Sequence, residues 1–133
     1  ADALVMAAAV ADHRPKDRAD VKLKKEAHGA TIELVENPDL LRTVGVARNG
    51  VRPVLVGFAV ETGTPEAVAA YARKKLASKK VDLVVANAAS DAFGRDDNVA
   101  IFVSPAGDAP QGTLSKDALA DRILDFVVNA LAR

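Results

Sequence analysis

Short, continuous apolar runs separated by helix-like segments constrain the fold of this chain more than any other feature. The runs occupy residues 3–10, 53–59 and 82–86. Such runs are typical of strands buried on both faces of a parallel sheet, although an Ala-rich run such as the first can also be helical. Half of the residues are hydrophobic and only 4% are aromatic, so Ala, Val, Leu and Ile must supply the core. The pattern predicts an α/β sandwich around a mostly parallel sheet.

Helix-start signals alternate with these runs. Asn37 and Thr64 are capping side chains, and each precedes a proline that suits the first helical position. Helices are predicted from these points to about residue 48 and about residue 79. Ser115 is predicted to cap a last helix, in which apolar residues keep the helical period as far as Leu131. A strand at residues 99–103 and a turn at 105–108 are predicted before it.

Residues 11–35 depart from this rhythm. Residues 11–19 are polar and contain Pro15, which predicts a loop. Residues 21–25 and 31–35 alternate between apolar and polar side chains on either side of Gly29, which predicts two half-polar strands joined by a loop. We expect these strands to form a protruding hairpin or flap.

Composition narrows the classes of function. Lys and Arg together number 18, as do Asp and Glu, so no general attraction to nucleic acid or to a membrane surface is expected. The absence of Cys excludes disulfides and a cysteine nucleophile on this chain. No apolar run reaches ~18 residues, so no transmembrane helix is expected. The 133 residues suit one domain, and they open on a strand without an initiating Met, so we interpret the chain as a piece of a longer protein.

A ligand site is expected where the predicted strands end. In open α/β sheets, ligands bind at the carboxyl ends of the strands, which selects the polar segments that begin at Asp12, near Phe58 and at Asn87. The alternative for each segment is an ordinary polar surface loop. The helix that opens at residues 37–39 offers unpaired backbone N–H groups to an anion, although simple capping is the commoner explanation.

Basic side chains are a second clue to a site. Lys22 and Lys24 fall on one face of their predicted strand, and Lys75 and Lys79 share one face of a predicted helix. The helix pair could hold a phosphate chain as two point charges, or it could be a solvated helix face. The pattern leaves both explanations open.

Several kinds of site are disfavoured. His13 and His28 have no neighbouring ligand at a metal-binding spacing. No G-x-G-x-x-G fingerprint and no Walker loop occurs, which disfavours a standard dinucleotide-binding fold and a P-loop kinase. The residues by themselves therefore indicate an α/β domain with a candidate site for an anionic ligand, and no more.

Six segments of the sequence, taken in order, resemble bacterial phosphopantothenate–cysteine ligases. They are AAAVADHRP (7–15), VKLKK (21–25), ELVENPDLL (33–41), VGFAVET (56–62), ARKKLASKKVDLVVAN (72–87) and FGRDDN (93–98). The segment SKDALADRIL (115–124) extends the resemblance nearly to the end of the chain. Several motifs in order are far more specific than any one of them.

This resemblance implies an activity and its partners. It implies the CTP-dependent joining of cysteine to 4′-phosphopantothenate through an acyl-cytidylate, which gives 4′-phospho-N-pantothenoylcysteine in coenzyme A biosynthesis. A divalent cation, normally Mg²⁺, accompanies the nucleotide. The ligase is cytoplasmic and is often fused to a decarboxylase domain that carries FMN. The implied fold is a three-layer Rossmann-like sandwich with a two-stranded flap, which crosses the two-fold axis of a homodimer.

The resemblance also assigns roles to individual residues. Lys22 matches the lysine linked to the second half-reaction and is the catalytic candidate. The residues that match nucleotide-contacting positions are Ala8, Asp12, Lys22, Asn37, Pro38, Asp39, Leu40, Phe58, Lys75 and Lys79. Asn87 is a candidate for holding substrate, and no protein ligand for a metal is assigned.

The sequence departs from the family pattern in places. His13 stands where an aromatic residue is usual, Val60 where a smaller Ala is usual, and Ala88 where Asp is common. A glycine-rich loop and an asparagine motif precede AAAVAD in the family and do not occur in these 133 residues, so we expect the isolated chain not to turn over. The alternatives are an ATP-dependent version of the ligase, a non-catalytic dimerisation or regulatory module of the same fold, and a Rossmann-like reductase.

Overall fold

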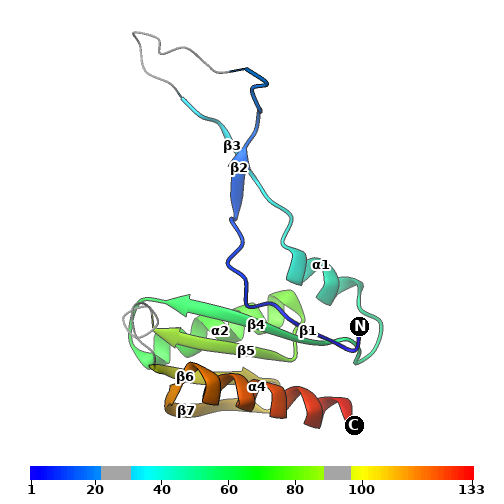
Figure 1. The fold of residues 1–133 in the computed structure, drawn as a ribbon, viewed down its shortest axis with the longest axis vertical. Coiled ribbons are helices and arrows are strands. Elements are labelled where there is room, and N and C mark those ends of the chain that lie inside the picture. Colours follow the sequence, from blue (N-terminus) through cyan, green and yellow to red (C-terminus); the bar gives the residue numbers. More distant parts are fainter. Residues whose placement is uncertain (22–30, 89–96) are drawn as a thin grey trace. The chain divides into compact units, whose positions relative to one another are not determined.

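The computed structural model describes residues 1–21, 31–88 and 97–133 (Figure 1). These residues form two compact units. The α/β unit comprises Ala1–Ala7 and Leu40–Arg133, and the strand-pair unit comprises Ala8–Asp39. Each unit has a sheet of its own.

The α/β unit is built on a five-stranded sheet. Its strands are β1 (Ala3–Val5), β4 (Val54–Glu61), β5 (Leu83–Ala88), β6 (Asp97–Ser104) and β7 (Gly107–Ser115). They lie in the order β1-β4-β5-β6-β7; β1, β4 and β5 are parallel, while β6 runs antiparallel to both of its neighbours. All of these strands except β6 therefore point the same way, and the prediction of a mostly parallel sheet is confirmed.

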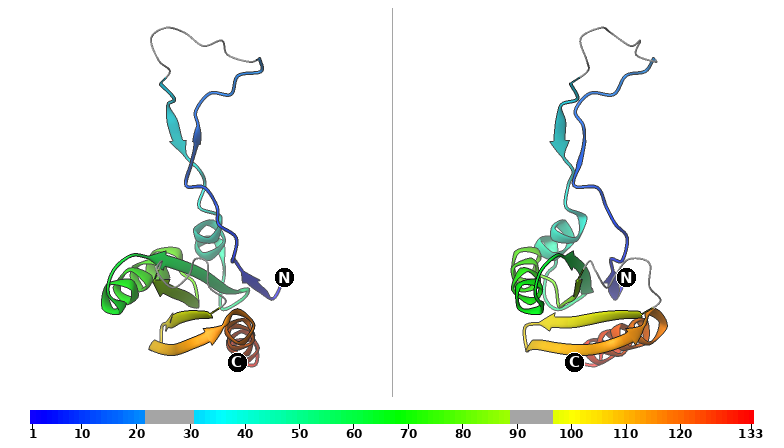
Figure 2. Two further views of the ribbon diagram at one scale, coloured as in Figure 1. Left: turned by 60° about the vertical axis from the view of Figure 1, so that its left-hand side comes forward. Right: turned by 90° about the vertical axis from the view of Figure 1, so that its left-hand side faces the viewer.

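Helices cover both faces of this sheet. In the described residues they are α1 (Leu40–Ala47), α2 (Pro65–Lys79) and α4 (Lys116–Leu131). α1 and α2 pack on one face and α4 on the other (Figures 1 and 2), which is the predicted three-layer sandwich. No helix in the described part of the chain is long and apolar enough to cross a membrane.

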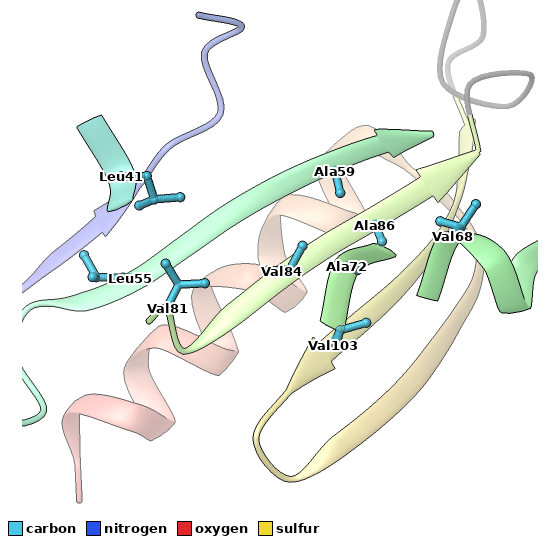
Figure 3. Close-up of a cluster of buried hydrophobic side chains, with 9 residues drawn as sticks. All are labelled: Leu41, Leu55, Ala59, Val68, Ala72, Val81, Val84, Ala86 and Val103. Carbon is cyan, nitrogen blue, oxygen red and sulfur yellow. The ribbon is translucent and has the colours of Figure 1, made fainter. Parts of the chain in front are cut away.

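Alternate residues along the strands feed two separate cores. On the α1–α2 side, Leu55 and Val84 pack with helix residues such as Leu41 and Val68 (Figure 3). The intervening strand residues pack on the other side with three side chains of α4, namely Leu119, Ile123 and Val127. Leu55 is 0% exposed, and full burial of such a side chain contributes about 1.5–3 kcal/mol. Burial on both faces explains the continuous apolar runs in the sequence.

The predicted caps of the two long helices are confirmed. Thr64 Oγ1 accepts a hydrogen bond from the backbone N–H of Ala67 at 3.4 Å, and Ser115 Oγ accepts one from Ala118 at 3.1 Å. In the first turn of α2, the backbone N–H of Glu66 and then the Thr64 hydroxyl stabilise the Glu66 carboxylate, which lowers the pKa of this exposed group. These interactions fix the start of the helix that carries Lys75 and Lys79.

A partly buried ion pair joins the amino ends of β4 and β5 to the end of α1. Arg48 donates to both carboxylate oxygens of Asp82, at 2.5 and 3.2 Å, and to the carbonyl oxygens of Pro53 and Lys80, at 2.9 and 3.0 Å. Asp82 also accepts from the backbone N–H of Leu55 at 2.7 Å. The Arg48 side chain is only 10% exposed, so this cluster braces the end of the sheet opposite to the predicted site.

A glycine allows α1 and α2 to pack closely. A Cβ atom at Gly45 would lie 1.9 Å from the carbonyl oxygen of Lys79. No side chain fits in that space, so this contact between the helices depends on residue 45 being glycine.

The strand-pair unit consists of β2 (His13–Pro15) and β3 (Leu34–Glu36), paired antiparallel. None of its described side chains is buried. Isolated two-stranded ribbons are marginally stable in water, because they bury little apolar surface. Within the described residues, this unit therefore has strands but no core.

Several strand predictions were wrong. β1 ends at Val5 rather than at residue 10. In the described residues it pairs only with β4, and its last bond to that strand runs from the N–H of Met6 to Val56 O at 2.9 Å. β2 lies in a segment predicted as a loop, and β3 begins at Leu34 rather than at residue 31. The predicted strand at residues 21–25 lies outside the described residues, apart from Val21.

The strand β7 and the start of α1 also differ from the prediction. β7 contains Gly107, Pro110 and Gly112, which are turn-forming residues in most settings. Among the described strands it pairs only with β6, and an edge strand tolerates such residues. α1 begins at Leu40 rather than at Pro38, so Asn37 does not cap it as predicted.

Candidate functional site

The structure divides the predicted site residues into groups. Lys22, the catalytic candidate, and Lys24 lie outside the described residues. The members in the strand-pair unit are Ala8, Asp12, Asn37, Pro38 and Asp39. The members in the α/β unit are Leu40, Phe58, Lys75, Lys79 and Asn87.

Tyr71, Lys75 and Lys79 form one row along α2, at a spacing of four residues. The row flanks the buried stripe of Val68 and Ala72, which are 2% and 0% exposed. The ammonium nitrogen of Lys75 lies 4.9 Å from the centre of the Tyr71 ring, which is a cation–π contact. The two lysines therefore share one helix face, as predicted, and Tyr71 is a third member of that face.

The basic residues of α2 do not all serve one surface. Arg73 lies on the other side of the buried stripe and forms an ion pair with Asp108 of β7. Leu40, at the start of α1, is 52% exposed, and α1 packs on the same face of the sheet as α2. This face thus carries three of the predicted nucleotide contacts, namely Leu40, Lys75 and Lys79.

Phe58 and Asn87 lie on the opposite face of the sheet. Phe58 packs against the core beneath α4, and alternation along β5 puts Asn87 on the same face. Asn87 is 8% exposed and is the one buried polar residue in the described part of the chain. Its neighbours across the strands are Val60 and Ala100. Asn87 thus places a buried amide, which has both donors and acceptors, near the carboxyl end of β5.

The sheet separates these two sets of side chains. Phe58 faces α4, whereas Lys75 and Lys79 belong to a helix on the other face. Within the α/β unit, a ligand that contacts both sets would have to extend around the carboxyl ends of β4 and β5. The individual roles of these residues stay predictions.

In the strand-pair unit, polar bonds link the two strands beside Asp12. Arg14 Nη1 donates to Glu36 O at 2.9 Å and to Asn37 Oδ1 at 3.1 Å. Asn37 Nδ2 donates to Ala11 O at 2.7 Å, and the backbone N–H of Asn37 donates to Asp12 O at 2.8 Å. The Asn37 amide therefore joins the two strands.

The remaining candidates of this unit are exposed. Ala8 was expected inside a buried strand, and this was wrong because β1 ends at Val5 and Ala8 is exposed. Pro38 and Asp39 are also exposed. Exposure leaves all three accessible to a ligand.

Two residues of interest were missed in the sequence. Tyr71 could have been found from its four-residue spacing to Lys75, because this spacing places both on one helix face. Arg14 gives no such signal, since its acceptors lie 22 and 23 residues along the chain.

The described residues contain no cluster of side chains that could bind a metal ion. In residues 1–21, 31–88 and 97–133, no group of three or more His, Asp or Glu side chains could hold a metal ion.

Comparison with known proteins covers nearly the whole chain. The family model described as DNA/pantothenate metabolism flavoprotein C-terminal domain matches residues 1–131. The chain is 41% identical over 129 residues to the coenzyme A biosynthesis bifunctional protein CoaBC of Vibrio parahaemolyticus, over 93% of this chain and 31% of that protein. It is 45% identical over 143 residues to the protein of the same name from Mycobacterium tuberculosis, over 99% of this chain and 34% of that protein. The chain thus spans about a third of the length of these relatives.

Solved structures share the fold. The chain matches a crystal structure of the C-terminal domain of coenzyme A biosynthesis bifunctional protein CoaBC with a TM-score of 0.68 and 30% identity, over 95% of this chain and 53% of that one. It matches the DNA/pantothenate metabolism flavoprotein from Streptococcus pneumoniae with a TM-score of 0.73 and 20% identity, over 91% and 60%. The second likeness supports the fold alone.

Proposed function

The chain belongs to the family of the DNA/pantothenate metabolism flavoprotein C-terminal domain, and on that premise we propose that it is the nucleotide-binding part of a phosphopantothenate–cysteine ligase. The observation that carries the proposal is the match of the family model to residues 1–131. Relatives at 41% and 45% identity are named for coenzyme A biosynthesis, which supports the same pathway. The ordered segments from AAAVADHRP to FGRDDN support the ligase activity in particular.

The proposed reaction has two steps. A carboxylate oxygen of 4′-phosphopantothenate attacks the α-phosphorus of CTP, pyrophosphate leaves, and an acyl-cytidylate forms. The amine of cysteine then attacks the acyl carbon, CMP leaves with the former carboxylate oxygen, and the amine loses a proton. Positive groups near the phosphates would stabilise the charge that develops as pyrophosphate leaves.

Lys75 and Lys79 are the proposed phosphate ligands on the α1–α2 face. Each ammonium group acts as a point charge, and the Tyr71 ring helps to hold that of Lys75. Arg73 is not proposed for this role, because its charge is matched by Asp108. The other proposed nucleotide contacts are Ala8, Asp12, Asn37, Pro38, Asp39, Leu40 and Phe58, with Asn87 a candidate contact to substrate and Lys22 serving the second step.

Mg²⁺ is proposed to arrive with the nucleotide. The cation would be held mainly by triphosphate oxygens and water, since Mg²⁺ at nucleotide sites keeps several waters and binds substrate phosphates. Asp12 is exposed and could supply one carboxylate oxygen. When bound, the cation would neutralise phosphate charge. Any FMN-dependent decarboxylase fused to the ligase would lie outside these 133 residues.

A homodimer is the proposed assembly. Three apolar side chains of the strand-pair unit, Val10, Ile32 and Leu34, are 52%, 68% and 59% exposed. A second copy of the chain would bury them and would give the strand pair the apolar cover that it lacks. Leu34→Asp should then shift the sedimentation of the protein toward monomer, whereas Leu124→Asp, on the 56% exposed position of α4, should leave it unchanged. A parent protein that sediments as a fully active monomer would refute the dimer.

Lys22→Gln tests the ligase proposal in the full-length gene product. Pyrophosphate release from CTP and 4′-phosphopantothenate should remain measurable, while formation of the cysteine adduct stalls. The matched control is Lys16→Gln, since Lys16 is an exposed lysine paired only with Glu33 in the described residues. Unchanged product formation by Lys22→Gln would refute the role of Lys22 in the second step. A parent protein that consumes no nucleoside triphosphate would refute the proposed ligase activity.

Competition between nucleotides separates the proposal from its nearest alternative. CTP should support adduct formation by the parent at concentrations where ATP does not. Preference for ATP would favour the ATP-dependent ligase. Binding of neither nucleotide would favour a non-catalytic module of the same fold.

A further inference from the structure

Arg14 lies at the centre of the polar bonds that close the strand pair. Its Nη1 group donates to a backbone oxygen of β3, Glu36 O at 2.9 Å, and to the side-chain oxygen of Asn37 at 3.1 Å. A guanidinium presents several N–H donors in a fixed plane, so one side chain can hold two acceptors at once. Arg14 thereby fixes both the end of β3 and the orientation of the next residue.

Asn37 in turn forms hydrogen bonds to the residues that precede β2. Its Nδ2 donates to Ala11 O at 2.7 Å, while its backbone N–H donates to Asp12 O at 2.8 Å. The Asn37 amide is thus held at both ends, by Arg14 at Oδ1 and by Ala11 at Nδ2. Each end still has capacity to spare, because a primary amide has a second N–H and a second lone pair.

These bonds hold together two segments that the proposed function assigns to the nucleotide. One segment contains Asp12, and the other is the run from Asn37 to Asp39. The described side chains of this unit form no core, so these hydrogen bonds contribute directly to the separation of the two segments.

We propose that Arg14 is a positioning residue for nucleotide binding, which acts by orienting the Asn37 amide and by holding it beside Asp12. This proposal rests on the proposed function for its substrate. It assigns no contact between Arg14 and the nucleotide itself. Its premise is that a preorganised site binds more tightly than one that must order its residues on binding.

A matched control lies on the same strand pair. Lys16 donates to Glu33 Oε2 at 2.9 Å, and its backbone N–H donates to Glu33 O at 2.8 Å. This pair also links the two sides of the strand pair, but it involves neither Asp12 nor Asn37, and its side chains are 57% and 66% exposed. Loss of Lys16 should therefore remove a cross-strand bond without changing the orientation of Asn37.

The experiment compares Arg14→Ala, Arg14→Lys and Lys16→Ala in the full-length gene product. We expect Arg14→Ala to raise the KM for CTP by about threefold to tenfold, in line with the loss of charge-assisted hydrogen bonds at an exposed site. The KM for cysteine should stay within about twofold. Arg14→Lys should fall between parent and Arg14→Ala, since an ammonium group keeps the charge without the planar fork. Lys16→Ala should match the parent.

A spectroscopic readout tests the same restraint without any assay of activity. The Asn37 side-chain NH₂ signals of the ¹⁵N-labelled protein should move in Arg14→Ala and stay in place in Lys16→Ala. Unmoved Asn37 signals in Arg14→Ala would overturn the proposal, as would equal rises in the KM for CTP and for cysteine, which indicate a general structural defect. If the parent shows no ligase activity, the proposed function fails, and the Asn37 signals still decide whether Arg14 orients that amide.

Discussion

The α/β unit and the strand-pair unit keep their strands together by different forces. In the α/β unit, side chains such as Leu55 and Leu83 are 0% exposed, and helices cover both faces of the sheet. In the strand-pair unit no described side chain is buried, and the strands are joined by backbone bonds and a few exposed polar side chains. The comparison teaches that the first unit can be stable through its own core, whereas the second depends on whatever covers it.

The largest effect is expected for Leu55→Ala in the α/β unit. This change removes a fully buried side chain from the core beneath α1 and α2, and should lower the free energy of unfolding by about 2–5 kcal/mol. Chemical denaturation measures it. Leu34→Ala, on a side chain of the strand-pair unit that is 59% exposed, is the matched change and should cost less than about 0.5 kcal/mol in a monomer. Equal losses would break the comparison.

A smaller effect is expected for Gly45→Ala. The added Cβ would meet the carbonyl oxygen of Lys79 at 1.9 Å, and forcing α1 away from α2 should cost about 1–3 kcal/mol. Gly57→Ala should cost less, because its Cβ would meet only a methyl carbon of Leu41, at 2.7 Å, which belongs to a side chain that can move. Thermal unfolding of the two variants measures this order. A larger loss of stability for Gly57→Ala than for Gly45→Ala would show that the contact between α1 and α2 is unimportant.

A comparable or slightly smaller loss is expected for Arg48→Ala. The variant leaves the Asp82 carboxylate and two carbonyl oxygens without their guanidinium partner, which should cost about 1–2 kcal/mol at a partly exposed site. Arg52→Ala is the control, since Arg52 is 57% exposed, its ion pair with Asp2 spans 3.7 Å, and it donates to the carbonyl oxygen of Leu131 at 2.9 Å. Urea denaturation measures the free energy of unfolding of both variants. A larger loss for Arg52→Ala than for Arg48→Ala would contradict a stabilising role for the Arg48–Asp82 cluster.

The smallest effect is expected for the Lys16–Glu33 pair of the strand-pair unit. Both side chains are more than half exposed, so the coupling energy from a double-mutant cycle should not exceed about 0.5 kcal/mol. Raising the salt concentration should reduce it further. A coupling of several times this value would show that the pair is covered by something else in solution, and would sharpen the question of what covers this unit.

The sequence predicted those parts of the fold that local chemistry determines. The caps at Thr64 and Ser115 follow from side chains that reach their own helix, and the buried strands around Leu55 and Val84 follow from two-sided apolar burial. β7 was missed because strand formation at an edge depends on the partner β6 rather than on the residues of β7. β2 was missed for the same reason, since its partner lies about twenty residues away on the chain.

The candidate site was predictable to a similar degree. The four-residue spacing of Lys75 and Lys79 predicted a shared helix face, because helix geometry is local. The orientation of Asn37 was not predictable, because it depends on Arg14 and Ala11, which are brought to it by the pairing of distant segments. The placement of Phe58 on the α4 face, away from the lysines, depends on where the helices dock rather than on the strand itself.

The bare backbone at Gly45 has a consequence for the chemistry proposed for α2. Because Gly45 lies against the carbonyl oxygen of Lys79, the position of the last turn of α2 depends on its contact with α1. A bulkier residue 45 would push that turn outward and would carry the ammonium group of Lys79 with it. The position of the Lys79 ammonium group on α2 thus depends on the absence of a side chain at Gly45 on α1.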